Sequence, residues 1–133
     1  MQLYLVSTVR TNNFNDEQIM NKIKTVWEEA YQHLGQDQSS IKYGVYYNYE
    51  SDYKGDYSLG VATQDRYGES ILSIPENEKY EVFTVDISNE YGIVDVWKKI
   101  WELEEAGELE RAYSYDFETY FPNGEIEIHI AIK

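Results

Sequence analysis

The sequence predicts a single α+β domain in which two fused β-α-β-β units form one antiparallel sheet with two main helices. Two observations predict this class. The order strand–helix–strand–strand occurs twice, over residues 1–65 and 78–133, although the halves share little residue identity. Short turns join the paired strands, which indicates hairpins rather than the crossovers of a doubly wound sheet. Two such halves around a pseudo-twofold axis leave a groove at their junction, where we expect a ligand pocket.

The first half begins with an alternating apolar pattern that predicts a strand over residues 3–9. Asn15 and Gln18 have the spacing of a capping box. Apolar residues then recur at helical spacing up to Gly35, so a helix is predicted over residues 16–34. A tyrosine-rich strand over 41–50 is followed by a turn at 51–56 and by a second strand over 57–63. Residues 64–77 are expected to connect the two halves, with a short strand at 70–74.

The second half repeats the order. A strand is predicted over residues 80–87, and Ile93, Val96, Trp97, Ile100 and Leu103 then mark a helix that ends near Gly107. The chain closes with strands over 113–121 and 125–132, which flank a turn at Pro122-Asn123-Gly124.

Composition excludes several classes of protein. The chain has 133 residues, 25 acidic and 11 basic side chains, and a formal net charge of -14. Direct binding to nucleic acid or to an anionic membrane needs the opposite charge. Residues 1–9 lack the basic start of a signal peptide, and no stretch approaches the ~20 apolar residues of a membrane span. The absence of cysteine excludes thiolate chemistry. We therefore expect a cytoplasmic protein.

Motifs for metals, cofactors and nucleophilic catalysis are missing, so no metal or cofactor is predicted. His33 and His129 are far apart in the sequence and are expected at the surface or at an edge. A run of acidic residues at the end of the second helix is expected to be a solvated face; it comprises Glu102, Glu104, Glu105, Glu108 and Glu110. Aromatic residues make up 16% of the chain, with 14 tyrosines. This suits either a dense core or a pocket for a flat or cationic ligand.

The first strand of the last hairpin carries a notable carboxylate. Strand parity places Asp116, Glu118 and Tyr120 on one face. The other face takes Tyr115, Phe117, Thr119 and Phe121. On parity alone, Glu118 is a solvent-facing side chain of a half-exposed sheet.

Five motifs extend over nearly the whole chain. They are Tyr43-Gly44-Val45-Tyr46-Tyr47; Asp56-Tyr57-Ser58-Leu59-Gly60; Ile74-Pro75 with Tyr80-Glu81-Val82-Phe83; Trp97-Lys98-Lys99-Ile100-Trp101; and Asp116-Phe117-Glu118-Thr119-Tyr120 with Gly124-Glu125-Ile126-Glu127-Ile128-His129-Ile130. In order and spacing they resemble gyrase-inhibitor-like proteins, the effector-binding domain family of bacterial transcription activators. The resemblance implies two fused β-α-β-β units around a central pocket for diverse small molecules, often cationic and aromatic.

The resemblance also implies a site and a mode of action. Such domains often follow a DNA-binding helix-turn-helix, for which this sequence has no room, so a stand-alone binder is implied. The pocket carboxylate of the family corresponds to Glu118. The candidate ligand-binding residues are Glu118, Tyr120, Tyr43, Tyr46, Tyr57, Trp97 and Trp101. Core packing is an equal alternative for these aromatic residues, with the exception of Tyr120.

Three functions follow from the resemblance. The leading one is a non-catalytic binder of cationic or amphipathic aromatic compounds that senses or sequesters drugs. The second is a hydrolase of cyclopropane-bearing natural products, with Glu118 as the base and Tyr120 or Trp101 orienting the substrate. The third is an interaction protein that modulates gyrase or another protein partner.

Overall fold

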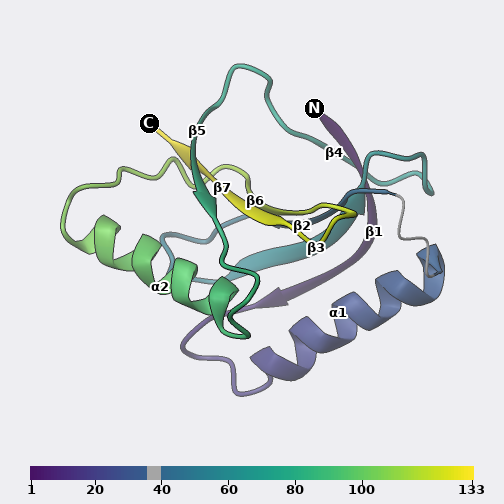
Figure 1. The fold of residues 1–133 in the computed structure, drawn as a ribbon, viewed down its shortest axis with the longest axis horizontal. Coiled ribbons are helices and arrows are strands. Elements are labelled where there is room, and N and C mark those ends of the chain that lie inside the picture. Colours follow the sequence, from purple (N-terminus) through teal and green to yellow (C-terminus); the bar gives the residue numbers. More distant parts are fainter. Residues whose placement is uncertain (36–39) are drawn as a thin grey trace.

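The strands of the described residues form one curled antiparallel sheet, which confirms the α+β class. The computed structural model describes residues 1–35 and 40–133 (Figure 1). In chain order the elements are β1 (Gln2–Thr11), α1 (Ile19–Leu34), β2 (Lys42–Tyr47), β3 (Tyr57–Thr63), β4 (Ile71–Ser73), β5 (Lys79–Thr84), α2 (Gly92–Glu105), β6 (Asp116–Tyr120) and β7 (Ile126–Ile132).

The order of the strands across the sheet is nearly symmetric. It runs β4-β1-β3-β2-β6-β7-β5. Without the short β4, the order β1-β3-β2 in the first half mirrors β5-β7-β6 in the second. The two halves join where β2 pairs with β6, and Gly44 lies opposite Glu118 in this pairing. We call the β2–β6 pairing the seam.

Both helices cover the same face of the sheet, and the connection from β4 to β5 arches over the other (Figure 1). On the helical face, Val26 and Ala30 of α1 pack on Tyr57, Leu59 and Val61. On the same face, Ile100 of α2 packs with Val85, Leu109, Ile128 and Ile130. The opposite face has its own core of Leu3, Tyr43, Val45, Tyr47, Ala62, Ile74 and Phe117. Burial on both faces stabilises the sheet by removing apolar area from water.

The first helix is shorter than predicted at its N-terminus. It begins at Ile19, and the capping box is wrong, since no side chain caps the helix. Asp16 instead accepts hydrogen bonds from the Gln18 backbone N–H, the Thr11 hydroxyl and the Lys22 ammonium. Gly35 ends the helix at φ +70°, as predicted. Within the described residues, neither helix is long and apolar enough to cross a membrane.

The strands β2, β6 and β5 are shorter than their sequence patterns predicted. β2 stops at Tyr47 because Asn48 has φ +51°, which turns the chain out of the sheet. β6 begins only at Asp116, after Tyr113 at φ +55°. β5 ends at Thr84 rather than at residue 87.

Candidate functional site

Glu118 lies in the middle of β6 on the helical face of the sheet, beside the seam. Its side chain is 3% exposed. The pairing of Glu118 with Ile128 puts it on the face that carries the apolar side chains of β7. The expectation of a solvent-facing carboxylate from parity alone is therefore wrong, because the helices cover this face.

Three neutral donors hold the carboxylate. The hydroxyl of Tyr46 and the indole N–H of Trp97 donate to Oε2, at 2.9 and 2.8 Å. The hydroxyl of Tyr120 donates to Oε1 at 2.7 Å. Hydrogen bonds to an ionised acceptor are about twice as strong as neutral ones, so these contacts fix the carboxylate in one orientation. Among the described residues, the side-chain hydrogen bonds to this carboxylate come from these three residues.

Burial has the largest effect on the ionisation of Glu118. Loss of hydration raises the pKa of the carboxyl above its usual 4.5, and the bonds from Trp97, Tyr120 and Tyr46 oppose this rise. Burial, together with the nearby carboxylate, raises the pKa values of Tyr46 and Tyr120 well above 10. Both phenols therefore remain protonated donors at neutral pH.

Gly44 makes room for this arrangement across the seam. A Cβ at position 44 would lie 3.0 Å from Oε1 of Glu118 and 3.2 Å from Cζ2 of Trp27. The indole of Trp27 and the carboxylate are thus neighbours above the glycine. Trp27 also meets the Tyr120 ring edge-on, with ring centroids 4.9 Å apart.

Gly44 and Trp27 were not among the predicted site residues, although the sequence contains signals for both. A glycine inside a strand often marks the close approach of another group. Trp27 stands in Ile23-x-x-Val26-Trp27, and the same spacing recurs as Ile93-x-x-Val96-Trp97 in α2. The two tryptophans therefore hold equivalent positions in the two halves.

Replacing Gly44 with alanine is expected to destabilise the protein by about 1–2 kcal/mol, because the new methyl group overpacks the site. Urea denaturation would measure the loss. Trp27→Phe removes the indole atom that lies 3.2 Å from the new methyl group, so the double variant should recover part of the stability. Additive losses in the double variant would contradict this packing.

The structure brings four of the predicted aromatic residues to the carboxylate or next to it. Tyr46, Trp97 and Tyr120 contact Glu118 directly. Tyr57 lies behind Tyr46, with ring centroids 5.6 Å apart.

Tyr43 and Trp101 lie elsewhere. Tyr43 points to the opposite face, where it meets Phe117 at 5.9 Å between ring centroids. Trp101 lies one helical turn beyond Trp97 and stacks on Tyr53, with centroids 5.4 Å apart. The structure does not bring either residue to Glu118.

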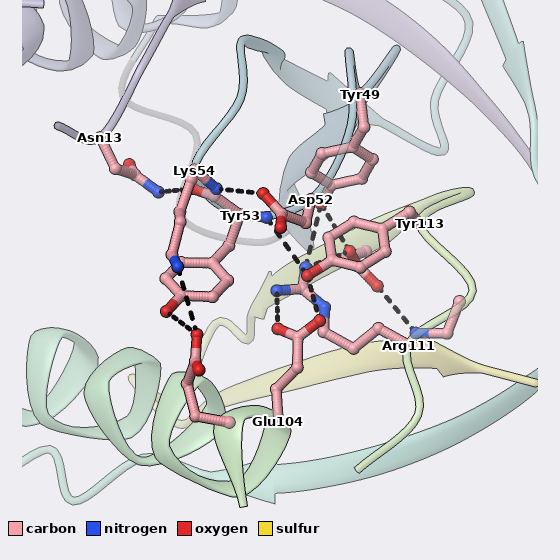
Figure 2. Close-up of polar contacts among 11 residues, drawn as sticks. Asn13, Tyr49, Asp52, Tyr53, Lys54, Glu104, Arg111 and Tyr113 are labelled. Atoms are coloured by element: carbon pink, nitrogen blue, oxygen red, sulfur yellow. Dashed lines mark hydrogen bonds and ion pairs between the residues drawn. The ribbon is translucent and has the colours of Figure 1, made fainter. Parts of the chain in front are cut away.

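A second buried carboxylate, Asp116, lies on the same face as Glu118 but is neutralised. Arg111 donates to its Oδ2 at 2.8 Å, and both side chains are at most 1% exposed. The hydroxyl of Tyr49 donates to the same oxygen at 2.5 Å, and the backbone N–H of Ala131 donates to Oδ1. Figure 2 shows Arg111 among Tyr49, Tyr113 and Glu104. Asp116 therefore has a cationic partner, whereas the partners described for Glu118 are neutral.

Two open concavities of the described surface lie away from Glu118. One lies between β1 and α1, near Val9 and Lys22. Another lies beside the β5 edge, near Phe83 and Leu109. Neither is lined by Glu118, which is enclosed by its aromatic neighbours. Within the described residues, no group of three His, Asp or Glu side chains could hold a metal ion.

Comparison with known proteins assigns this architecture to a family. The model of the Cass2 family, described as integron-associated effector binding proteins, matches residues 5–132. This chain belongs to the Cass2 family. Membership agrees with the effector-binding role that the motifs implied and indicates a small-molecule ligand, whereas the narrower gyrase-inhibitor-like assignment stays a prediction.

Two relatives of the Cass2-family chain illustrate its range. The crystal structure of the integron cassette protein VCH_CASS2, from the mobile metagenome of Vibrio cholerae, is 28% identical and has a TM-score of 0.76. The match covers 100% of this chain and 90% of that one. YobU of Bacillus subtilis (strain 168), named as a candidate transcriptional regulator, is 27% identical over 145 residues, which cover 93% of this chain and 88% of YobU.

Proposed function

We propose that this Cass2-family protein binds small organic cations with an aromatic part, and that it senses or sequesters such compounds. The observation that carries the proposal is the buried carboxylate of Glu118. It is 3% exposed, and the partners described for it are the neutral donors Tyr46, Trp97 and Tyr120.

The physical basis is the cost of an uncompensated charge in an apolar site. Burial raises the pKa of Glu118 because the ionised form has lost its hydration. A bound cation compensates the carboxylate where the effective dielectric constant is lower than in water. The faces of the surrounding rings attract cations and stack on flat molecules without demanding one shape. The carboxylate therefore selects for charge, and the rings tolerate varied ligands.

Thermal unfolding with matched ligands tests the proposal. The fixed aromatic cation 10-methylacridinium should raise the melting temperature, and its neutral analogue 9-methylanthracene should not. A ligand at a hundred times its Kd stabilises the folded state by about 2.7 kcal/mol. Glu118→Gln, which keeps the shape of the side chain, should weaken binding of the cation at least tenfold.

The matched control is Glu125→Gln, which removes one negative charge from an exposed residue of the same hairpin. It should leave binding unchanged. Equal weakening by the two substitutions would mean that overall charge, and not the site, attracts the ligand. A panel of aromatic cations without any shift would refute the proposed function.

The hydrolase alternative uses the same carboxylate. It requires that Glu118 activates water and that Tyr120 orients the substrate. Analysis of products after incubation with a cyclopropane-bearing compound separates the two functions. Turnover that Glu118→Gln abolishes would establish hydrolysis, and recovery of the intact compound would support binding alone.

A further inference from the structure

A ligand can reach Glu118 only if one of the surrounding rings moves. The carboxylate is 3% exposed, whereas the rings of Trp27, Tyr46, Trp97 and Tyr120 are partly exposed. These rings therefore separate the carboxylate from solvent. Which of them moves determines the direction of entry and the place of the bound cation.

Three of the rings are tied to the carboxylate. Displacing Tyr46, Trp97 or Tyr120 breaks a charge-assisted hydrogen bond to Glu118. Trp97 is held further, because the Arg111 guanidinium faces its ring at 5.9 Å from the centroid. A second cation at Trp97 would thus meet a ring that already has a positive neighbour.

Trp27 differs from its counterpart Trp97. Within the described part of the chain, its ring contacts are with Tyr31, at 6.1 Å between centroids, and with Tyr120 at 4.9 Å. No hydrogen bond joins it to the carboxylate. Trp27 also packs on the apolar cluster beneath α1. Moving Trp27 therefore breaks ring and apolar contacts, but it leaves all three hydrogen bonds to the buried charge intact.

The space over Gly44 is too small for a methyl group while Trp27 is in place, and it would suit a cation once Trp27 moves outward. Gly44 has no side chain, and a Cβ there would lie between Oε1 of Glu118 and Cζ2 of Trp27, at 3.0 and 3.2 Å. Outward movement of the indole widens this gap next to the carboxylate. A cation in the gap would face one carboxylate oxygen and one aromatic ring, and the glycine would not obstruct it.

We propose that Trp27 is the gate of the site, and that the positive centre of the ligand enters from the α1 side and lies over Gly44, between Trp27 and Oε1 of Glu118. The identity of the ligand in this inference rests on the proposed function. The assignment of Trp27 as the gate rests on the contacts around Glu118. It assigns unequal roles to the equivalent tryptophans. Trp27 moves and contacts the cation, while Trp97 stays fixed and orients the carboxylate.

The gate can be tested without ligand. The three tryptophans of the chain can be labelled with 5-fluorotryptophan and assigned by Trp→Phe variants. The ¹⁹F signal of Trp27 should be broadened by exchange, and that of Trp97 should be narrow. Hydrogen exchange of the indole N–H should be at least tenfold faster at Trp27 than at Trp97. Equal exchange at the two residues would overturn the gate.

Ligand binding tests the subsite. Addition of 10-methylacridinium should shift the Trp27 signal most. Trp27→Ala should raise the association rate constant at least fivefold and weaken affinity at least tenfold; Trp27→Phe should show the same trend with smaller changes. Trp101→Phe is the matched control and should alter neither quantity.

The outcomes separate the two proposals. Normal binding with a response at Trp97 alone, and an unchanged association rate in the Trp27 variants, would overturn the gate and leave the proposed function intact. An absence of binding to the unmodified protein would refute the proposed function and the subsite together. The exchange rates of the free protein would still decide whether Trp27 is the mobile ring.

Discussion

Replacing Asp116 with alanine is expected to lower the free energy of unfolding by about 3–5 kcal/mol, because the buried Arg111 would keep only the more distant carboxylate of Glu104, at 3.6 Å, as an ionic partner. The two side chains form an ion pair at 2.8 Å and are at most 1% exposed. Two further donors, from Tyr49 and the Ala131 backbone, would also lose their acceptor. Chemical denaturation would measure the loss.

The control is Asp65→Ala, which removes the same side chain from an exposed position and should change stability by less than about 0.5 kcal/mol. Replacing both partners, in the double variant Arg111→Met with Asp116→Leu, should restore part of the stability, because neither member of the fully buried pair is left without the other. A loss below about 1 kcal/mol for Asp116→Ala alone would show that the pair is not the buried unit described above.

Glu118→Gln is expected to stabilise the free protein at pH 7, by about 0.5–2 kcal/mol, the range typical of single stabilising substitutions. Burial raises the folded-state pKa of Glu118 above 4.5. The folded protein therefore holds the proton more tightly than the unfolded chain. The cost of the ionised form is absent below the unfolded pKa, grows as the pH rises toward the folded pKa, and is constant above it.

Denaturation of both proteins at several pH values would check this dependence. The advantage of Glu118→Gln over the unmodified protein should be largest at neutral pH, should shrink as the pH falls from the raised folded-state pKa toward 4.5, and should be absent at lower pH. Glu125→Gln, which replaces an exposed carboxylate of the same hairpin, is denatured in parallel as the control for the change in net charge. A pH-independent difference, or a loss of stability at pH 7, would contradict the raised pKa of Glu118.

Local patterns predicted most of the fold. The bounds of β3 were predicted to the residue from its apolar pattern. Gly35 ends α1 as expected, because the conformational freedom of glycine acts at that one position. The errors lie where side-chain interactions or the backbone conformation of one residue override the local sequence pattern. Asp16 pairs with Lys22 and Thr11 instead of extending the helix. The positive φ of Asn48 ends β2 within an alternating pattern that gives no sign of it.

The site was only partly accessible from the sequence. The burial of Glu118 depends on both helices covering one face, which strand parity does not reveal. Parity did contain information on Tyr43, because residues 43 and 46 of one strand point to opposite faces. The glycine at position 44 and the spacing shared by Trp27 and Trp97 were also readable. The ion pair between Arg111 and Asp116 could not be predicted from the sequence, because Arg111 lies in an irregular part of the chain before β6.

The seam has a consequence for how this protein family can change over evolutionary time. The strand order of the two halves is that expected from duplication of an ancestral β-α-β-β segment. The site at the seam has nevertheless lost this equivalence, because one half contributes Gly44 and the other contributes Glu118. Each half can therefore acquire substitutions without a matching change in the other. Substitutions in α1 can therefore change the surroundings of Glu118 while the carboxylate and its three donors are retained.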